Sequence, residues 1–165
     1  MIGWCLWTAN NQLMPGNYDM EHDVLKMLAA YRDGQMSRED FIRWFDTQKA
    51  TLSTQLPRSS FLQLRYASAY VAATALAKVL PACTNCTTIC PQHTFSSWQE
   101  YKQCEGRVDH AEAVGTLLRM SPPAWAVDIP KGGGADGYYR CAKCGAVWGI
   151  VRPERQENGS WRRLA

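Results

Sequence analysis

Long apolar runs are missing from this sequence. No stretch of about 20 apolar residues is free of charge, so we expect no membrane-spanning helix. The closest approach is the alanine-rich segment 66–77, whose flanks Arg65 and Lys78 favour a buried helix instead. The first eight residues have no basic region and too short an apolar run for a signal peptide. We therefore expect a cytoplasmic protein with reduced thiols.

Familiar catalytic motifs are also missing. The sequence has no G-x-S-x-G, no P-loop, no G-x-G-x-x-G and no H-E-x-x-H. A net charge of +3 is too small to indicate nucleic-acid binding. The charge is unevenly distributed, because residues 1–50 hold seven acids and five bases, whereas residues 51–165 hold eight and thirteen. The acidic N-terminal part suits a basic partner and the basic C-terminal part suits an acidic one.

The pattern of apolar residues predicts an α+β fold in a single domain spanning 1–165. The helical part is 1–81, in which Ser37 caps the second helix. The third helix, opened by Pro57 and ended by Pro81, is apolar nearly all round and should be the buried centre. Including two in the C-terminal part, the predicted helices cover 20–33, the segment after Ser37, 59–80, 97–103 and 108–120.

The C-terminal part is 82–165. Besides the two helices, the sequence predicts a zinc-knuckle loop and a zinc-ribbon-like antiparallel hairpin there. Residues 82–95 and 131–137 read as loops, and Asn158-Gly159 is a turn signal. The predicted strands are 138–141, 146–151 and 160–164.

Two cysteine pairs dominate the C-terminal part. Cys83 with Cys86, and Cys141 with Cys144, have the C-x-x-C spacing that turns two thiolates toward one ion. Gly145 follows the second pair and would let the chain fold back on itself. Four thiolates predict a closed structural Zn²⁺ site, although the same ligands would also suit iron. The total of seven cysteines is odd, which argues against a disulfide framework.

A second interpretation uses His110-Ala-Glu112 together with Cys141 and Cys144. These two motifs resemble those of zinc-dependent nucleobase and nucleoside deaminases, whose signature is H-x-E followed by P-C-x-x-C. The resemblance implies that His110 and the two cysteines bind zinc while Glu112 moves protons. Arg140 stands where that family has proline. A charged first helical turn is the structural alternative for His110 and Glu112.

Other metal-binding side chains are scattered between the two pairs. Cys90, His93, Cys104 and His110 form a possible second ligand set. Alternatively, Cys90 or Cys104 is a buried thiol, as we expect for Cys5, or a substitute ligand for the first site. A nucleic-acid-binding ribbon is a third interpretation, because basic side chains there accompany two aromatic ones that could stack on bases. The alternative is a solvated β-surface whose tryptophans pack in the core. The residues concerned are Arg140, Lys143, Arg152, Arg155, Arg162, Arg163, Trp148 and Trp161.

The segment 31–45 contains, in this order, an aromatic residue, Asp-Gly, Ser-Arg-Glu-Asp-Phe and Trp-Phe. It resembles the opening helices of small bacterial immunity proteins, which neutralise toxins delivered between cells. The resemblance covers about 30 residues. It implies a non-catalytic protein that binds a cognate toxin and occludes its active site, with aromatic anchors for affinity and carboxylates for steering. The implied contact residues are Asp33, Glu39, Asp40, Trp44 and Asp46, with Asp19, Glu21 and Asp23 nearby.

Overall fold

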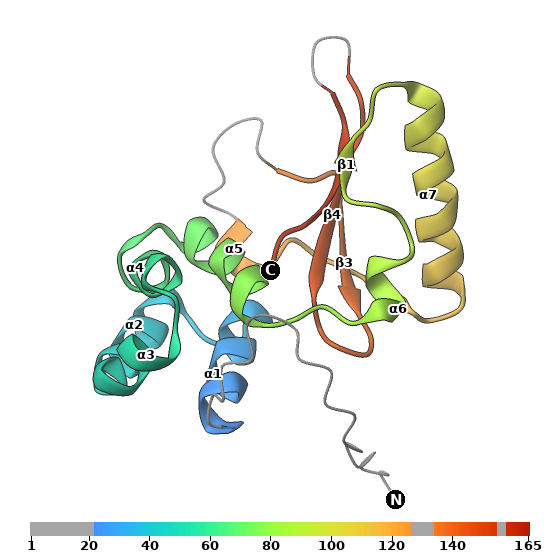
Figure 1. Ribbon diagram of the computed structural model, residues 1–165. Coiled ribbons are helices and arrows are strands. Elements are labelled where there is room, and N and C mark those ends of the chain that lie inside the picture. The colour runs from blue at the N-terminus through green and yellow to red at the C-terminus, as the bar shows by residue number, and fades with distance from the viewer. Residues whose placement is uncertain (1–21, 127–133, 155–157) are drawn as a thin grey trace, which may run out of the picture.

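The computed structural model describes residues 22–126, 134–154 and 158–165. In Figure 1 a cluster of helices lies on one side of an antiparallel sheet, and one long helix lies on the other. The predicted α+β class is therefore confirmed for these residues. Several expectations fall outside them and concern Cys5, Asp19, Glu21, Arg155 and part of the loop 131–137.

The N-terminal helices agree with the sequence pattern at their start. Ser37 caps the second helix, since its hydroxyl accepts a hydrogen bond from the Asp40 N–H at 3.0 Å. A short third helix, which we did not predict, follows directly. Between residues 22 and 80 the structure has α1 (His22–Arg32), α2 (Arg38–Thr47), α3 (Lys49–Gln55), α4 (Arg58–Tyr66) and α5 (Ala69–Val79).

The single long helix predicted over 59–80 is wrong. Ala67 takes an extended conformation, with φ −80° and ψ 171°, and separates α4 from α5. Ser68 then starts α5 by accepting a hydrogen bond from the Val71 N–H. The uninterrupted apolar pattern concealed this break, because both helices bury apolar side chains in the same cluster. The expected central helix is α5, on which Ala72 and Leu76 are fully buried.

The C-terminal part forms a larger sheet than the predicted hairpin. Among the described residues the strand order is β1-β5-β4-β3-β2, and all neighbours are antiparallel. The three predicted strands correspond to β3, β4 and β5, while β1 and β2 add an edge on each side. The elements are α6 (Thr84–Thr87), β1 (His93–Thr94), α7 (Trp98–Ala113), β2 (Leu117–Met120), η1 (Ala124–Ala126), β3 (Gly137–Cys141), β4 (Val147–Val151) and β5 (Ser160–Arg163).

Two further corrections concern helices and loops. The helices predicted over 97–103 and 108–120 are one helix, α7, followed by strand β2. Gly115, with a φ of +74°, ends the helix and turns the chain, so that Leu117 pairs with Cys141 across the sheet. The loop predicted over 82–95 contains α6 and β1. The turn signal Asn158-Gly159 adjoins residues 155–157, which lie outside the described part.

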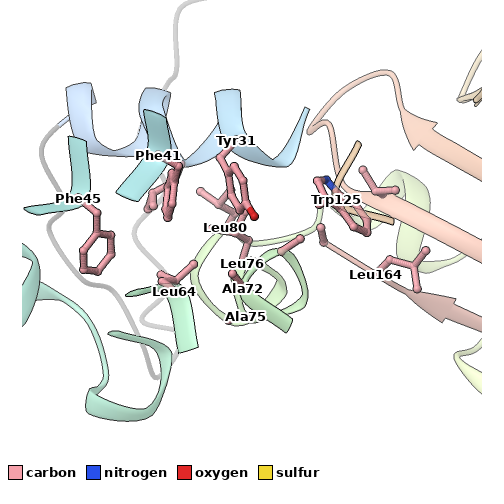
Figure 2. Packing of buried hydrophobic residues seen from close by; sticks show 14 of the residues in the cluster. Tyr31, Phe41, Phe45, Leu64, Ala72, Ala75, Leu76, Leu80, Trp125 and Leu164 are labelled. Carbon is pink, nitrogen blue, oxygen red and sulfur yellow. The ribbon is translucent and has the colours of Figure 1, made fainter. Parts of the chain in front are cut away.

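The sheet has a separate apolar cluster on each face. Tyr139, Trp148 and Trp161 face α7, whereas Tyr138 and Val147 face the N-terminal helices, as alternation along a strand requires. Figure 2 shows the second cluster, which runs from Phe45 and Phe41 past the side chains of α5 to Trp125 and Leu164. Strands β3 and β4 are therefore covered on both faces. Within the described residues, no helix is both long and apolar enough to cross a membrane.

Candidate metal centre

The four cysteines of the two C-x-x-C pairs converge. Their Sγ atoms all lie within 4.8 Å of one another. Three separations are 3.9 Å for Cys83–Cys86, 3.6 Å for Cys83–Cys141 and 3.7 Å for Cys86–Cys144. A tetrahedron of sulfurs about 2.3 Å from a zinc ion has edges of about 3.8 Å. The donor set and its spacing therefore fit a four-thiolate metal site.

Two distant segments supply the ligands. Cys83 is the N-cap of α6, and Cys86 lies in that helix three residues later, so both thiols point the same way. Cys141 ends β3 and Cys144 lies in the turn before β4. Cys86 and Cys141 are buried, and Cys83 and Cys144 are half-buried. The site therefore connects the segment after α5 to the β3–β4 hairpin.

Backbone amides surround the sulfurs of the second pair. The Cys141 sulfur accepts hydrogen bonds from the N–H groups of Lys143 and Cys144. The Cys144 sulfur accepts from the N–H groups of Ala146 and Cys83, the latter at 3.4 Å. Gly145 makes this turn possible with a φ of +73°, a conformation that residues other than glycine rarely adopt. The turn is arranged to stabilise negative charge on sulfur.

The thiols do not share one pKa. Burial, followed by the charges of Cys144 and Cys141, raises the pKa of the Cys86 thiol far above its ordinary value. Burial also raises the pKa of Cys141. Burial acts in the same direction on Cys144, but the N–H groups of Ala146 and Cys83 outweigh it and lower that pKa to about 7. The lowered pKa of Cys144 favours its thiolate form near neutral pH, which suits a cluster whose charge a metal ion offsets.

Two arginines lie close to the cluster. Four thiolates around a divalent ion carry a net charge of about −2, which nearby cations offset. Arg32, only 5% exposed, donates from Nη1 to the Cys144 carbonyl at 3.0 Å. Arg163 donates from Nη2 to the Leu80 carbonyl, and burial lowers its pKa while the charges of Cys144 and Cys86 raise it. Sequence reasoning missed Arg32 entirely and assigned Arg163 to the ribbon surface, because neither is near a cysteine along the chain.

Asp33 extends this network. Its carboxylate accepts from Arg32 Nε at 2.9 Å and from Arg140 Nη2 at 2.7 Å, and its side chain is 9% exposed. The indole N–H of Trp125 donates to the Arg32 carbonyl at 2.8 Å. The end of α1 is therefore joined to strand β3 and to the cysteine turn.

The other predicted partner-binding residues lie on α2. The side chains of Glu39, Asp40 and Asp46 are 83%, 56% and 45% exposed. Asp40 pairs with Arg43 at 2.7 Å, and Asp46 accepts two hydrogen bonds from Arg65. Trp44 is half-buried against the apolar cluster. Contact of any of these residues with a partner stays a prediction.

The deaminase ligand set is not assembled. His110 is exposed near the end of α7 and Glu112 is half-buried on the same helix. The one group of potential metal ligands found among the described residues is the four-cysteine cluster, which holds Cys141 and Cys144 without His110. A site with four protein thiolates has no open position for a reacting water.

The remaining candidate ligands form no second group in the part of the chain that the structure describes. Cys90 and Cys104 are each 2% exposed and hydrogen-bonded to each other, and burial raises the pKa of Cys104. His93 Nδ1 lies 2.6 Å from the Pro91 carbonyl oxygen. These thiols belong to the apolar cluster beneath α7.

The tryptophans of the predicted nucleic-acid ribbon are not available to bases. Trp148 and Trp161 are fully buried and stack with ring centroids 5.2 Å apart. Of the basic residues, Lys143 and Arg152 are exposed, whereas Arg140 pairs with Asp33. The described structure therefore favours the core alternative for both indoles.

Comparisons of the chain with models of protein families, with curated proteins and with solved structures find no match.

Proposed function

We propose that this chain is a non-catalytic binding protein stabilised by a structural Zn²⁺ ion. The observation that carries this proposal is the approach of four cysteine sulfurs to within 4.8 Å of one another. All four positions of the tetrahedral zinc coordination would be occupied by cysteine sulfurs, those of Cys83, Cys86, Cys141 and Cys144. The ion would hold the fold together and supply no catalysis.

The contribution of a bound zinc ion to the stability of the fold can be compared with the stability of a whole domain. Structural zinc contributes about 10–16 kcal/mol of apparent binding free energy in small zinc-binding peptides at neutral pH. A whole domain is typically stable by only about 5–15 kcal/mol. The ion would link the end of α5 to the β3–β4 hairpin, so its removal should unfold at least this region. Loss of zinc and loss of folded structure should therefore coincide.

We further propose that the binding role is toxin neutralisation, as in the immunity proteins that segment 31–45 resembles. Three exposed carboxylates on α2 support this role, because they would steer the protein toward a basic toxin surface. Trp44, half-buried beside them, would supply an aromatic anchor. Asp33 would contribute by fixing α1, since its carboxylate is already used inside the protein.

Co-expression with the toxin domain encoded by a neighbouring gene tests this role. The native chain should protect cells, and Glu39→Lys with Asp46→Lys should weaken toxin binding about tenfold, or about 1.4 kcal/mol. Glu154→Lys is the matched control, because Glu154 is exposed but lies beyond β4, away from α2. Absence of protection by a folded, zinc-loaded chain would refute the immunity role and leave the zinc site unaffected.

A further inference from the structure

A groove of about 600 Å³ lies along α7, on the side of this helix that faces α6 and Ile89. Its lining extends from Lys102 on α7 to Val114, the residue that follows this helix, and Asn85 of α6 and Ile89 form the opposite wall. Figure 1 shows α6 beside the end of α7 that leads to β2. The volume lies within the range of about 300–1,000 Å³ that is usual for binding sites.

The charge of the lining has one sign. The lining holds the cations Lys102 and Arg107 together with the imidazole of His110, and it holds no carboxylate. Lys102 pairs at 2.6 Å with Glu105, which does not line the groove. Among the described residues, the side chains of Arg107 and His110 have no hydrogen bond or ion pair. The groove therefore presents one cation, Arg107, to which the described structure gives no hydrogen bond or ion pair, beside Lys102, whose charge Glu105 partly offsets. With no carboxylate in the lining, this charge is complementary to an anionic ligand.

Gly106 lies in the middle of this wall. A Cβ atom built there would meet nothing within 4 Å, so packing in the described structure does not require glycine. Glycine inside a helix costs about 1 kcal/mol relative to alanine. The missing side chain keeps the groove open between Lys102 and His110 and would let a bound chain approach the helix closely.

We infer that this groove binds an extended acidic peptide segment of a partner protein. The lining from Lys102 to Val114 rises about 18 Å along α7 at 1.5 Å per residue. An extended peptide of about five residues spans the same length. Its carboxylates would meet Lys102, Arg107 and His110, and an apolar side chain between them would pack on Ile89 and Val114. This inference is independent of the toxin-neutralising role, which uses α2.

The test uses fluorescein-labelled five-residue peptides and fluorescence anisotropy at low salt with the full zinc-loaded chain. A peptide of alternating aspartate and leucine should bind at least tenfold more tightly than its lysine–leucine and aspartate–serine counterparts. Arg107→Glu, which reverses one groove charge, and Gly106→Leu, which fills the groove and favours helix, should each weaken binding at least tenfold. Lys49→Glu, at an exposed site on α3, away from both the groove and the cysteine cluster, should leave binding unchanged.

Several results would overturn the inference. They are no binding at millimolar peptide, equal binding of the lysine–leucine peptide, and unchanged binding by folded Arg107→Glu and Gly106→Leu proteins. Full displacement by free aspartate would assign the groove to small anions instead. Tighter binding of a single-stranded oligothymidylate at the same site would assign it to nucleic acid.

Discussion

Substitution of Gly145 by alanine tests how the cysteine turn is held. Gly145 has a φ of +73°, and a Cβ atom there would lie 2.0 Å from Arg32 Nη2. Because the obstacle is the guanidinium that donates to the Cys144 carbonyl, the methyl group must displace Arg32 from its hydrogen bond. The substitution therefore combines backbone strain with the loss of a buried, charge-assisted contact.

The cost of the backbone strain and the cost of the lost hydrogen bond can each be given a typical value and added. A left-handed conformation costs a residue other than glycine about 1–2 kcal/mol. A hydrogen bond to a charged group is worth about 1.5–3 kcal/mol. Gly145→Ala should therefore lower the free energy of unfolding by about 3–5 kcal/mol. For a chain of this length, that corresponds to a melting temperature lower by about 10 °C.

Gly115→Ala is the matched control, because Gly115 has a φ of +74° but nothing lies within 4 Å of the Cβ position. It should lose only the backbone term of about 1–2 kcal/mol. Urea unfolding of the zinc-loaded proteins, followed by circular dichroism, measures both. In the double variant Arg32→Ala with Gly145→Ala, the clash is absent, so the two losses should be less than additive by about 1.5–3 kcal/mol. Equal losses for Gly145→Ala and Gly115→Ala, or strictly additive ones, would refute the reasoning.

Three further substitutions should change the free energy of unfolding, again measured in urea. Asp33→Asn should cost about 3 kcal/mol, because it leaves the buried guanidinium of Arg32 without its carboxylate, whereas Glu39→Gln should cost less than about 0.5 kcal/mol. A small loss at position 33 would contradict the internal role of its carboxylate. Ser37→Ala should cost about 1 kcal/mol by removing the cap of α2, and an unchanged stability would show that the cap is dispensable. Gly106→Ala should stabilise the protein by about 1 kcal/mol, whereas destabilisation would reveal a packing role for the glycine.

The ligand cluster was the most predictable feature of this chain. A C-x-x-C spacing turns two thiols the same way whatever surrounds it, and two such pairs suffice to form one site. Arg32 and Asp33 were not predictable in this role, because they lie about 50 residues before Cys83, the first ligand of the cluster. Their contacts depend on how α1 packs against the sheet. From the sequence, Asp33 was therefore interpreted as an exposed carboxylate, whereas in the structure its side chain is only 9% exposed.

The spacing of apolar residues gave wrong element boundaries where contacts between distant segments decide whether a helix continues. Leu117 and Leu118 continue the apolar spacing of α7, yet Gly115 ends the helix and Leu117 pairs with Cys141 on β3. The break at Ser68 was concealed for the opposite reason, since α4 and α5 both pack into one cluster. The basic residues near Trp148 suggested an exposed ribbon, but α7 covers that face of the sheet.

The central claim is that one zinc ion is held by four thiolates and stabilises the fold. X-ray absorption spectroscopy of the purified protein, with metal analysis of variants, tests it most directly. We expect one zinc per chain with four sulfur neighbours at about 2.3 Å. Zinc should be lost in Cys83→Ser with Cys86→Ser and kept in His110→Ala. A nitrogen or oxygen neighbour at the zinc, together with loss of zinc in His110→Ala, would contradict the account.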